Sequence, residues 1–157
     1  MIDDLFVFDS VVHLHAMSDD DLAPGPVNAR HARDLVVGVG DALRPLHGVT
    51  TDWAGRTGVE EMYDLVFVRS PVDMAMAQTV PVFDWFVDFW APVRRNYDFA
   101  AAYPDRVLFC GGVDPMHRGV DFALDSMREQ AEDLGARSFK FYLGIDIAAK
   151  RRELYGD

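Results

Sequence analysis

Four short, largely apolar stretches constrain the fold of this 157-residue chain more than any other feature. They cover residues 5–12, 72–79, 107–113 and 137–143. The first stretch, residues 5–12, is nearly continuously apolar and rich in β-forming residues, which is typical of a strand buried on both faces of a parallel sheet. The intervals between the four stretches have room for helical crossovers, so the sequence predicts an α/β fold of parallel βαβ units.

The segments between the predicted strands have the periodicity of helices. Apolar residues recur every three or four positions over residues 28–43, 59–68 and 117–134. Asn28 is placed to cap the first of these helices, His117 lies at the start of the third, and Gly135 marks its end.

Proline and glycine mark the loops, which we expect over residues 16–27 and 45–58. An aromatic segment follows the second predicted strand and covers residues 83–103, and Pro92 is expected to start or kink a helix within it. Its aromatic residues are suited either to a core or to a pocket for a planar ring.

Two architectures fit four alternations of strand and helix. An open flavodoxin-like sheet is complete at this length, whereas a closed eight-stranded barrel typically takes about 250 residues. The strand count leaves both architectures open. In either case half of the residues are hydrophobic, so residues 1–157 can form one domain with an ordinary core.

Charge and composition make some classes of binding partner and some cellular locations unfavourable for this chain. The chain has 26 acidic and 15 basic residues and a net charge of −11, which disfavours nucleic acid and anionic membrane surfaces. Asp3 and Asp4 stand where a signal peptide would need positive charge, and no apolar run is long enough for a membrane span, so we expect a cytoplasmic protein. Cys110 lies in an apolar run and is interpreted as a small buried hydrophobe.

His13-Leu14-His15 directly follows the first predicted strand. In an extended segment residues i and i+2 point to the same side, so the two imidazoles can converge on one metal ion. The pattern is short, and a structural pair of histidines is the alternative. His31 and His47 lie in a helix and a loop without a matching partner and are interpreted as structural.

Other polar residues stand near the carboxyl ends of later strands, where parallel α/β folds place their sites. Asp114 ends the third strand and either lines a site or forms a turn with Pro115. Lys140 alternates with aromatic residues in the fourth strand, so it points either outward to solvent or inward to a site. Signatures of phosphate loops, cysteine clusters and serine-hydrolase elbows are absent from the sequence.

Taken together, these segments resemble the metal-dependent amidohydrolase-related family, in the branch that includes the aminocarboxymuconate semialdehyde and resorcylate decarboxylases. The stretches that carry the resemblance are residues 6–15, 71–80, 103–107, 112–115 and 136–142. The resemblance implies the amino-terminal half of a TIM-like (β/α)₈ barrel. It also implies a divalent metal, zinc or manganese, held by His13 and His15, and a hydrolase or decarboxylase acting on a small carboxylated or cyclic substrate. Some amidohydrolases use a carboxylated lysine at the end of the fourth strand to bridge two metals, but the branch that this chain resembles usually has one metal. The resemblance therefore leaves Lys140, like Asp114, as a candidate that lines the site or contacts substrate.

Two departures from the family pattern qualify what the resemblance implies. Val11 stands where the family often has an aspartate, and Asp9 is the nearest carboxylate that can support the histidines from behind. The later strands that supply further metal ligands in the family are not part of this chain. We therefore expect a truncated family member that forms a homo-oligomer or binds a partner that completes the barrel. The alternative is an inactive half-barrel that serves as an interaction module.

Overall fold

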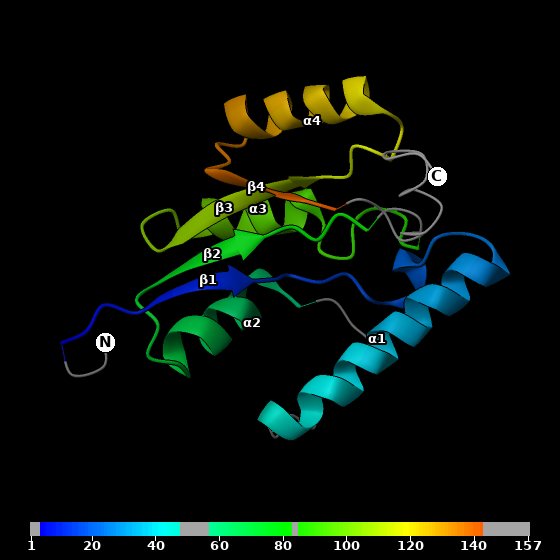
Figure 1. Cartoon of the computed structure of the whole chain (residues 1–157). Helices are drawn as coiled ribbons and strands as arrows, with labels where there is room; N and C mark the ends of the chain where they lie inside the picture. Colours follow the sequence, from blue (N-terminus) through cyan, green and yellow to red (C-terminus); the bar gives the residue numbers. More distant parts are fainter. Residues whose placement is uncertain (1–3, 48–56, 83–84, 143–157) are drawn as a thin grey trace, which may run out of the picture.

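The computed structural model describes residues 4–47, 57–82 and 85–142. Its strands form one parallel sheet, and their bounds are β1 Phe8–Val12, β2 Met74–Gln78, β3 Val107–Val113 and β4 Ser138–Phe141. All four coincide with the apolar stretches that predicted them. The spatial order is β1-β2-β3-β4, and the sheet curls into a half-barrel flanked by helices (Figure 1). A flavodoxin-like sheet places its second strand outside the first, so the sequential order excludes that alternative.

Helices occupy the intervals where periodicity predicted them. Their bounds are α1 Pro26–His47, α2 Val59–Tyr63, α3 Val93–Ala102 and α4 Val120–Glu132, with a 3₁₀ turn at Asp19–Asp21 and a π-helical turn at Asp64–Val68. Helices α2, α3 and α4 lie along the convex side of the curled sheet (Figure 1). Pro92 immediately precedes α3 with an extended backbone, as expected for a residue that starts a helix. None of the helices in the described ranges is long and apolar enough to cross a membrane.

The ends of two helices differ from the sequence expectation. Helix α1 begins at Pro26 rather than Asn28 and continues through Pro45, so His47 is its last residue and not part of a loop. Proline is favoured in a first helical turn, and near a last turn its missing N–H removes a single hydrogen bond. Residues 48–56 of the predicted loop lie outside the described residues.

The start of α4 also falls later than the periodicity indicated. Arg118 and Gly119 have positive φ angles of 60° and 90°, which interrupts the helical path before Val120. His117 therefore lies in the turn that precedes the helix. At the other end Gly135 has a φ of +66°, the left-handed conformation expected of a glycine that ends a helix.

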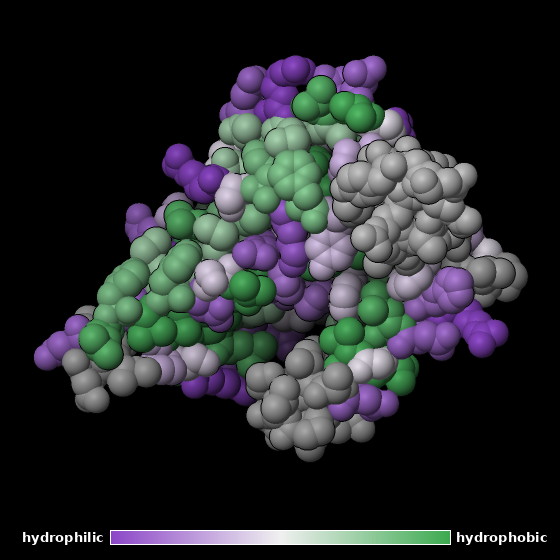
Figure 2. Space-filling view, viewed as in Figure 1, coloured by the Kyte–Doolittle hydropathy of each residue, from purple (hydrophilic) through white to green (hydrophobic). Residues whose placement is uncertain are grey.

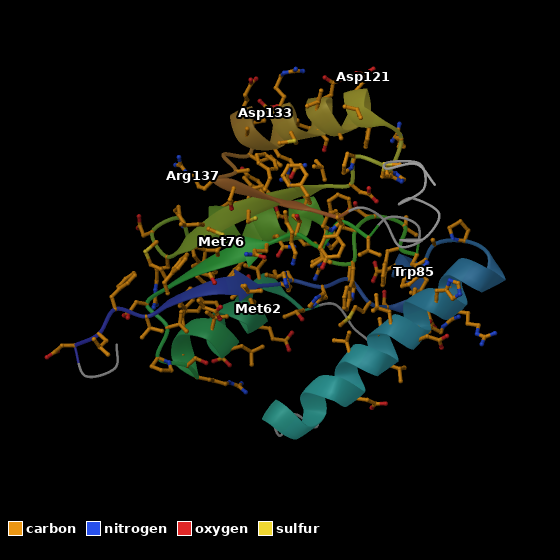
Figure 3. All side chains as sticks on the ribbon, in the orientation of Figure 1. Met62, Met76, Trp85, Asp121, Asp133 and Arg137 are labelled. Carbon is orange, nitrogen blue, oxygen red and sulfur yellow. The ribbon has the colours of Figure 1, made fainter. Side chains whose placement is uncertain are left out.

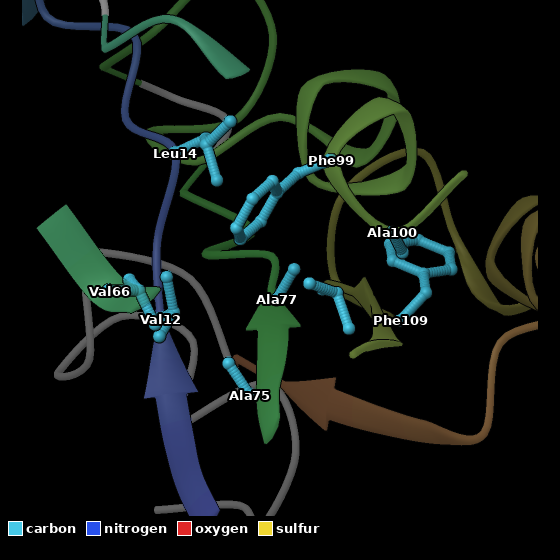
Figure 4. Packing of buried hydrophobic residues seen from close by; sticks show 9 residues of the cluster. Val12, Leu14, Val66, Ala75, Ala77, Phe99, Ala100 and Phe109 are labelled. Atoms are coloured by element: carbon cyan, nitrogen blue, oxygen red, sulfur yellow. The ribbon is translucent and has the colours of Figure 1, made fainter. Parts of the chain in front are cut away.

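The main core lies between the sheet and the helices on its convex side. Side chains from β1, β2 and β3 pack there against Phe99 and Ala100 of α3 and Val66 of the π-helical turn (Figure 4). The strand residues of this cluster are Val12, Ala75, Ala77, Val107 and Phe109, and Leu14 joins them from just beyond β1. Small residues on β2 let α3 approach the strand closely, and Phe99 then fills the space with no solvent exposure.

A second cluster places α1 near the carboxyl ends of the strands. Ala32 and Val36 of α1 pack against Val80, Val82 and Phe86, which lie in the connection after β2. This connection is tied to itself by an antiparallel bridge between Val80 and Ala91. The packing leaves α1 beside the mouth of the half-barrel, apart from the helices that cover the convex side (Figure 1).

Candidate metal centre

His13 and His15 extend from the carboxyl end of β1, with one residue between them. Leu14 is 1% exposed and belongs to the main core. Because side chains alternate along extended backbone, anchoring Leu14 in the core directs both histidines to the opposite, concave side. Their ring centroids lie 5.3 Å apart with the planes inclined at 60°.

The His13 ring is held by the neighbouring strand. Its Nδ1 lies 2.8 Å from the carbonyl oxygen of Gln78, the last residue of β2. A carbonyl oxygen only accepts, so Nδ1 must carry the proton and donate. This tautomer leaves Nε2 with its lone pair free to bind a metal, which is the arrangement that a carbonyl partner commonly imposes on metal-binding histidines.

A buried asparagine fixes the backbone between the two histidines. Asn96 of α3 is fully buried, and its Oδ1 accepts a hydrogen bond from the N–H of Leu14 at 3.0 Å. Its Nδ2 donates to the carbonyl of Pro92 at 2.8 Å, which orients the amide. On the other side, the ring of His15 packs against Trp90, with centroids 4.9 Å apart. The histidine pair is therefore anchored from α3 and from the connection after β2.

Burial keeps both imidazoles neutral. The pKa of His15 is lowered to about 3, chiefly by desolvation and in smaller measure by the charges of His13 and Lys140. Desolvation is also the largest cause that lowers the pKa of His13, and the hydrogen bond to Gln78 partly opposes it. Neutral imidazole is the form that binds metal ions, so at neutral pH both rings are in the form that a metal site requires.

The two histidines line a cavity of about 230 Å³ at the mouth of the half-barrel. The other lining residues are Met17, Val36, Val39, Val80, Trp90, Lys140 and Tyr142. Lys140 thus points inward, the site-lining alternative, and its ammonium lies 5.4 Å from the centre of the Tyr142 ring. Burial lowers the pKa of Lys140. Figure 2 shows a hollow in the surface between the strands and α1. Figure 3 shows the side chains of the molecule from the same side.

Other residues singled out from the sequence lie apart from this cavity. Asp114 forms the turn with Pro115, where its Oδ1 accepts a hydrogen bond from the N–H of Met116 at 2.9 Å. His31 packs against Trp85, and His117 packs edge-on against Phe122. The remaining two residues also have local roles. Asp9 accepts a hydrogen bond from the N–H of Val11 rather than from a histidine ring, and Cys110 is buried without a disulfide.

The donor set fits part of a metal site. Two neutral imidazoles with one ring nitrogen fixed by a carbonyl suit zinc, but catalytic zinc normally has three protein ligands. Within the described ranges, histidine, cysteine and acidic side chains do not form a group of three or more that could hold a metal. Comparison of the chain with protein-family models, with curated proteins and with solved structures found no match.

Proposed function

We propose that this chain contributes the first-strand half of a divalent metal site in a TIM-like barrel of the amidohydrolase type. The observation that carries the proposal is the hydrogen bond from His13 Nδ1 to the Gln78 carbonyl, which leaves Nε2 for a metal beside His15. Zinc suits nitrogen donors of this kind, and manganese is the alternative. The resulting activity would be hydrolysis or decarboxylation of a small carboxylated or cyclic substrate in the cytoplasm.

The cavity supports that class of substrate. A bound metal supplies Lewis acidity toward a substrate oxygen or a water molecule. Lys140 offers an ammonium to a substrate carboxylate, and the apolar lining around it strengthens such a pair by excluding water. The rings of Trp90 and Tyr142 provide flat apolar surfaces against which a cyclic substrate can pack.

A second function is favoured by the incomplete ligand set. With two histidines and, in the described residues, no third metal-binding side chain beside them, the half-barrel can also serve as an interaction module without catalysis. The two functions differ in whether metal binding leads to turnover, because an interaction module requires neither a bound metal nor turnover.

Metal content tests the site most directly. The chain is purified without chelator, and zinc and manganese are measured by mass spectrometry in the wild type, in His13→Ala/His15→Ala and in His31→Ala as a matched control. We expect the double variant to lose the metal and the control to retain it. Equal metal content in all three proteins would refute the assignment. Metal that depends on both histidines, without release of carbon dioxide or hydrolysis over a panel of cyclic carboxylates and lactones, would favour the module.

A further inference from the structure

Both edges of the sheet are open to a further strand. Strands β1 and β4 stand at the ends of the described sheet, and no described strand pairs with their outer sides. Large apolar side chains are exposed along both edges. These are Phe6 (66% exposed), Phe8 (40%) and Val11 (54%) at β1, and Phe141 (56%) at β4. Unpaired edges with exposed apolar side chains are surfaces on which another strand can be added.

The charges at the two edges are opposite. Asp4 lies four residues before the start of β1 and Arg137 lies directly before β4, both exposed. Figure 3 shows Arg137 at the start of its strand. Parallel pairing brings the amino-terminal ends of two strands to the same end of the sheet, so β4 of one molecule placed beside β1 of another brings Arg137 to the end where Asp4 lies. Parallel pairing of β1 with β1 would instead bring Asp4 of both copies to the same end, in a chain that already carries a net charge of −11.

We infer that a second copy of this chain closes the half-barrel, with β4 of each copy pairing with β1 of the other. A two-fold axis along the barrel axis produces this arrangement and keeps all strands parallel. Four strands from each copy give the eight-stranded barrel whose interior side chains just fill. At β1 an incoming strand must displace the exposed hydrogen bond from the Val11 N–H to Asp9, which is a small cost in solvent.

The same two-fold symmetry brings the histidine pairs of the two copies to one site. The inference that they share a metal ion there rests on the proposed function. Because the two-fold axis runs along the strands, the carboxyl ends of the strands of both copies lie at the same end of the barrel. The partner's β1 is the fifth strand of the combined barrel. In such barrels each interior layer contains side chains from alternate strands, so the first and fifth strands contribute to the same layer. His13 and His15 of one copy then face His13 and His15 of the partner subunit, which supplies the ligands that one chain lacks.

Charge reversal at the edges tests the closure. Light scattering during size-exclusion chromatography, and dilution followed by native mass spectrometry, measure the dimer in wild type, Arg137→Asp, Asp4→Arg and the combined variant. We expect each single reversal to weaken the dimer at least tenfold and the combination to restore it. Arg128→Asp, which reverses an exposed arginine on α4, is the matched control and should dimerise as wild type does. Circular dichroism verifies that every variant is folded.

Metal stoichiometry tests the shared site separately. We expect one zinc ion per two chains in the wild type, and loss of tight binding in mixed dimers that carry one His13→Ala/His15→Ala chain. A folded monomer that binds one ion would overturn the inference and leave the proposed function standing. A dimer rescued by charge exchange but without metal would overturn the proposed function and the shared site with it. A larger assembly, or edge variants that dimerise like wild type, would overturn the two-copy barrel.

Discussion

The side-chain oxygen of Asn96 accepts a hydrogen bond from the backbone N–H of Leu14 at 3.0 Å, which ties α3 to the residue between the two candidate metal ligands. Both partners are buried, so the bond is shielded from water. It fixes the backbone from which His13 and His15 project, although Asn96 itself does not line the cavity. A substitution at Asn96 therefore affects metal binding only by changing the position of the two histidines.

Replacing Asn96 with alanine should destabilise the fold and weaken metal binding together. The variant leaves the buried Leu14 N–H without a partner, which costs about 1–3 kcal/mol in the free energy of unfolding. We also expect lower zinc affinity in competition with a chromophoric chelator, because the histidines are no longer held in place. Asp98→Ala changes an exposed residue of the same helix and should alter the free energy of unfolding by less than about 0.5 kcal/mol. Unchanged zinc affinity in folded Asn96→Ala would show that Asn96 does not position the site.

Gly111 of β3 should not tolerate a side chain. A Cβ there would meet Gln130 Oε1 of α4 and would lie 2.9 Å from the Phe139 ring of β4. Gln130 cannot move freely, because its amide bonds both backbone groups of Gly112 at 2.9 and 3.1 Å. Denaturant titration of Gly111→Ala should show a loss of about 1–3 kcal/mol in the free energy of unfolding.

The matched control for that substitution is Gly38→Ala in α1. A Cβ at Gly38 has no atom within 4 Å, and alanine in a helix interior is favoured over glycine by about 0.5–1 kcal/mol. We therefore expect opposite signs for the two glycines. Destabilisation of similar size at both positions would contradict the packing described at β3.

The neutral state of His15 predicts a dependence of stability on pH. Its pKa falls from 6.5 to about 3 on folding, so between these values the unfolded chain binds the proton that the folded chain excludes. The free energy of unfolding should therefore rise as pH increases from about 3 to 6.5 and level off above. One pKa unit corresponds to about 1.4 kcal/mol, so His15 contributes at most roughly 5 kcal/mol to this rise.

Urea titrations between pH 4 and 8 in the presence of chelator measure that slope. His15→Gln removes the titrating group and should flatten the rise substantially relative to wild type. An identical slope in both proteins would mean that the proton excluded on folding does not belong to His15.

Much of the fold could be predicted from the sequence because its strands are short, largely apolar segments separated by helical ones, although β1 and β4 are only partly buried. Each predicted strand overlaps an observed one, and β3 coincides with its predicted bounds at Val107–Val113. Strand order was not predictable from periodicity, because alternation of strands and helices is common to open sheets and barrels. The ends of α1 are not predictable from composition, since Pro26 and Pro45 indicate loops although both lie within the helix.

The candidate site was predictable in part. His13 and His15 follow from alternation along an extended segment, whereas the inward direction of Lys140 depends on the register of β4 against β3, where Lys140 pairs with Gly112. Asn96 was missed because its role depends on a contact across 82 residues. A polar residue on the apolar face of α3 was the only local signal for it. Trp90 was weighed as pocket or core, and it lines the cavity while packing on His15.

Replacing Lys140 with methionine should separate metal binding from substrate binding. The positive charge of Lys140 lowers the pKa of both His13 and His15, so its removal should raise both pKa values, measured from the imidazole proton signals in an NMR titration. Less repulsion of a cation should increase zinc affinity, and the missing ammonium should weaken binding of a carboxylate such as benzoate. Methionine keeps most of the side-chain volume, so these effects follow from charge. Arg128→Met removes an exposed charge on α4 and should change neither affinity. A parallel loss of zinc and benzoate binding in Lys140→Met would instead indicate that the cavity had collapsed.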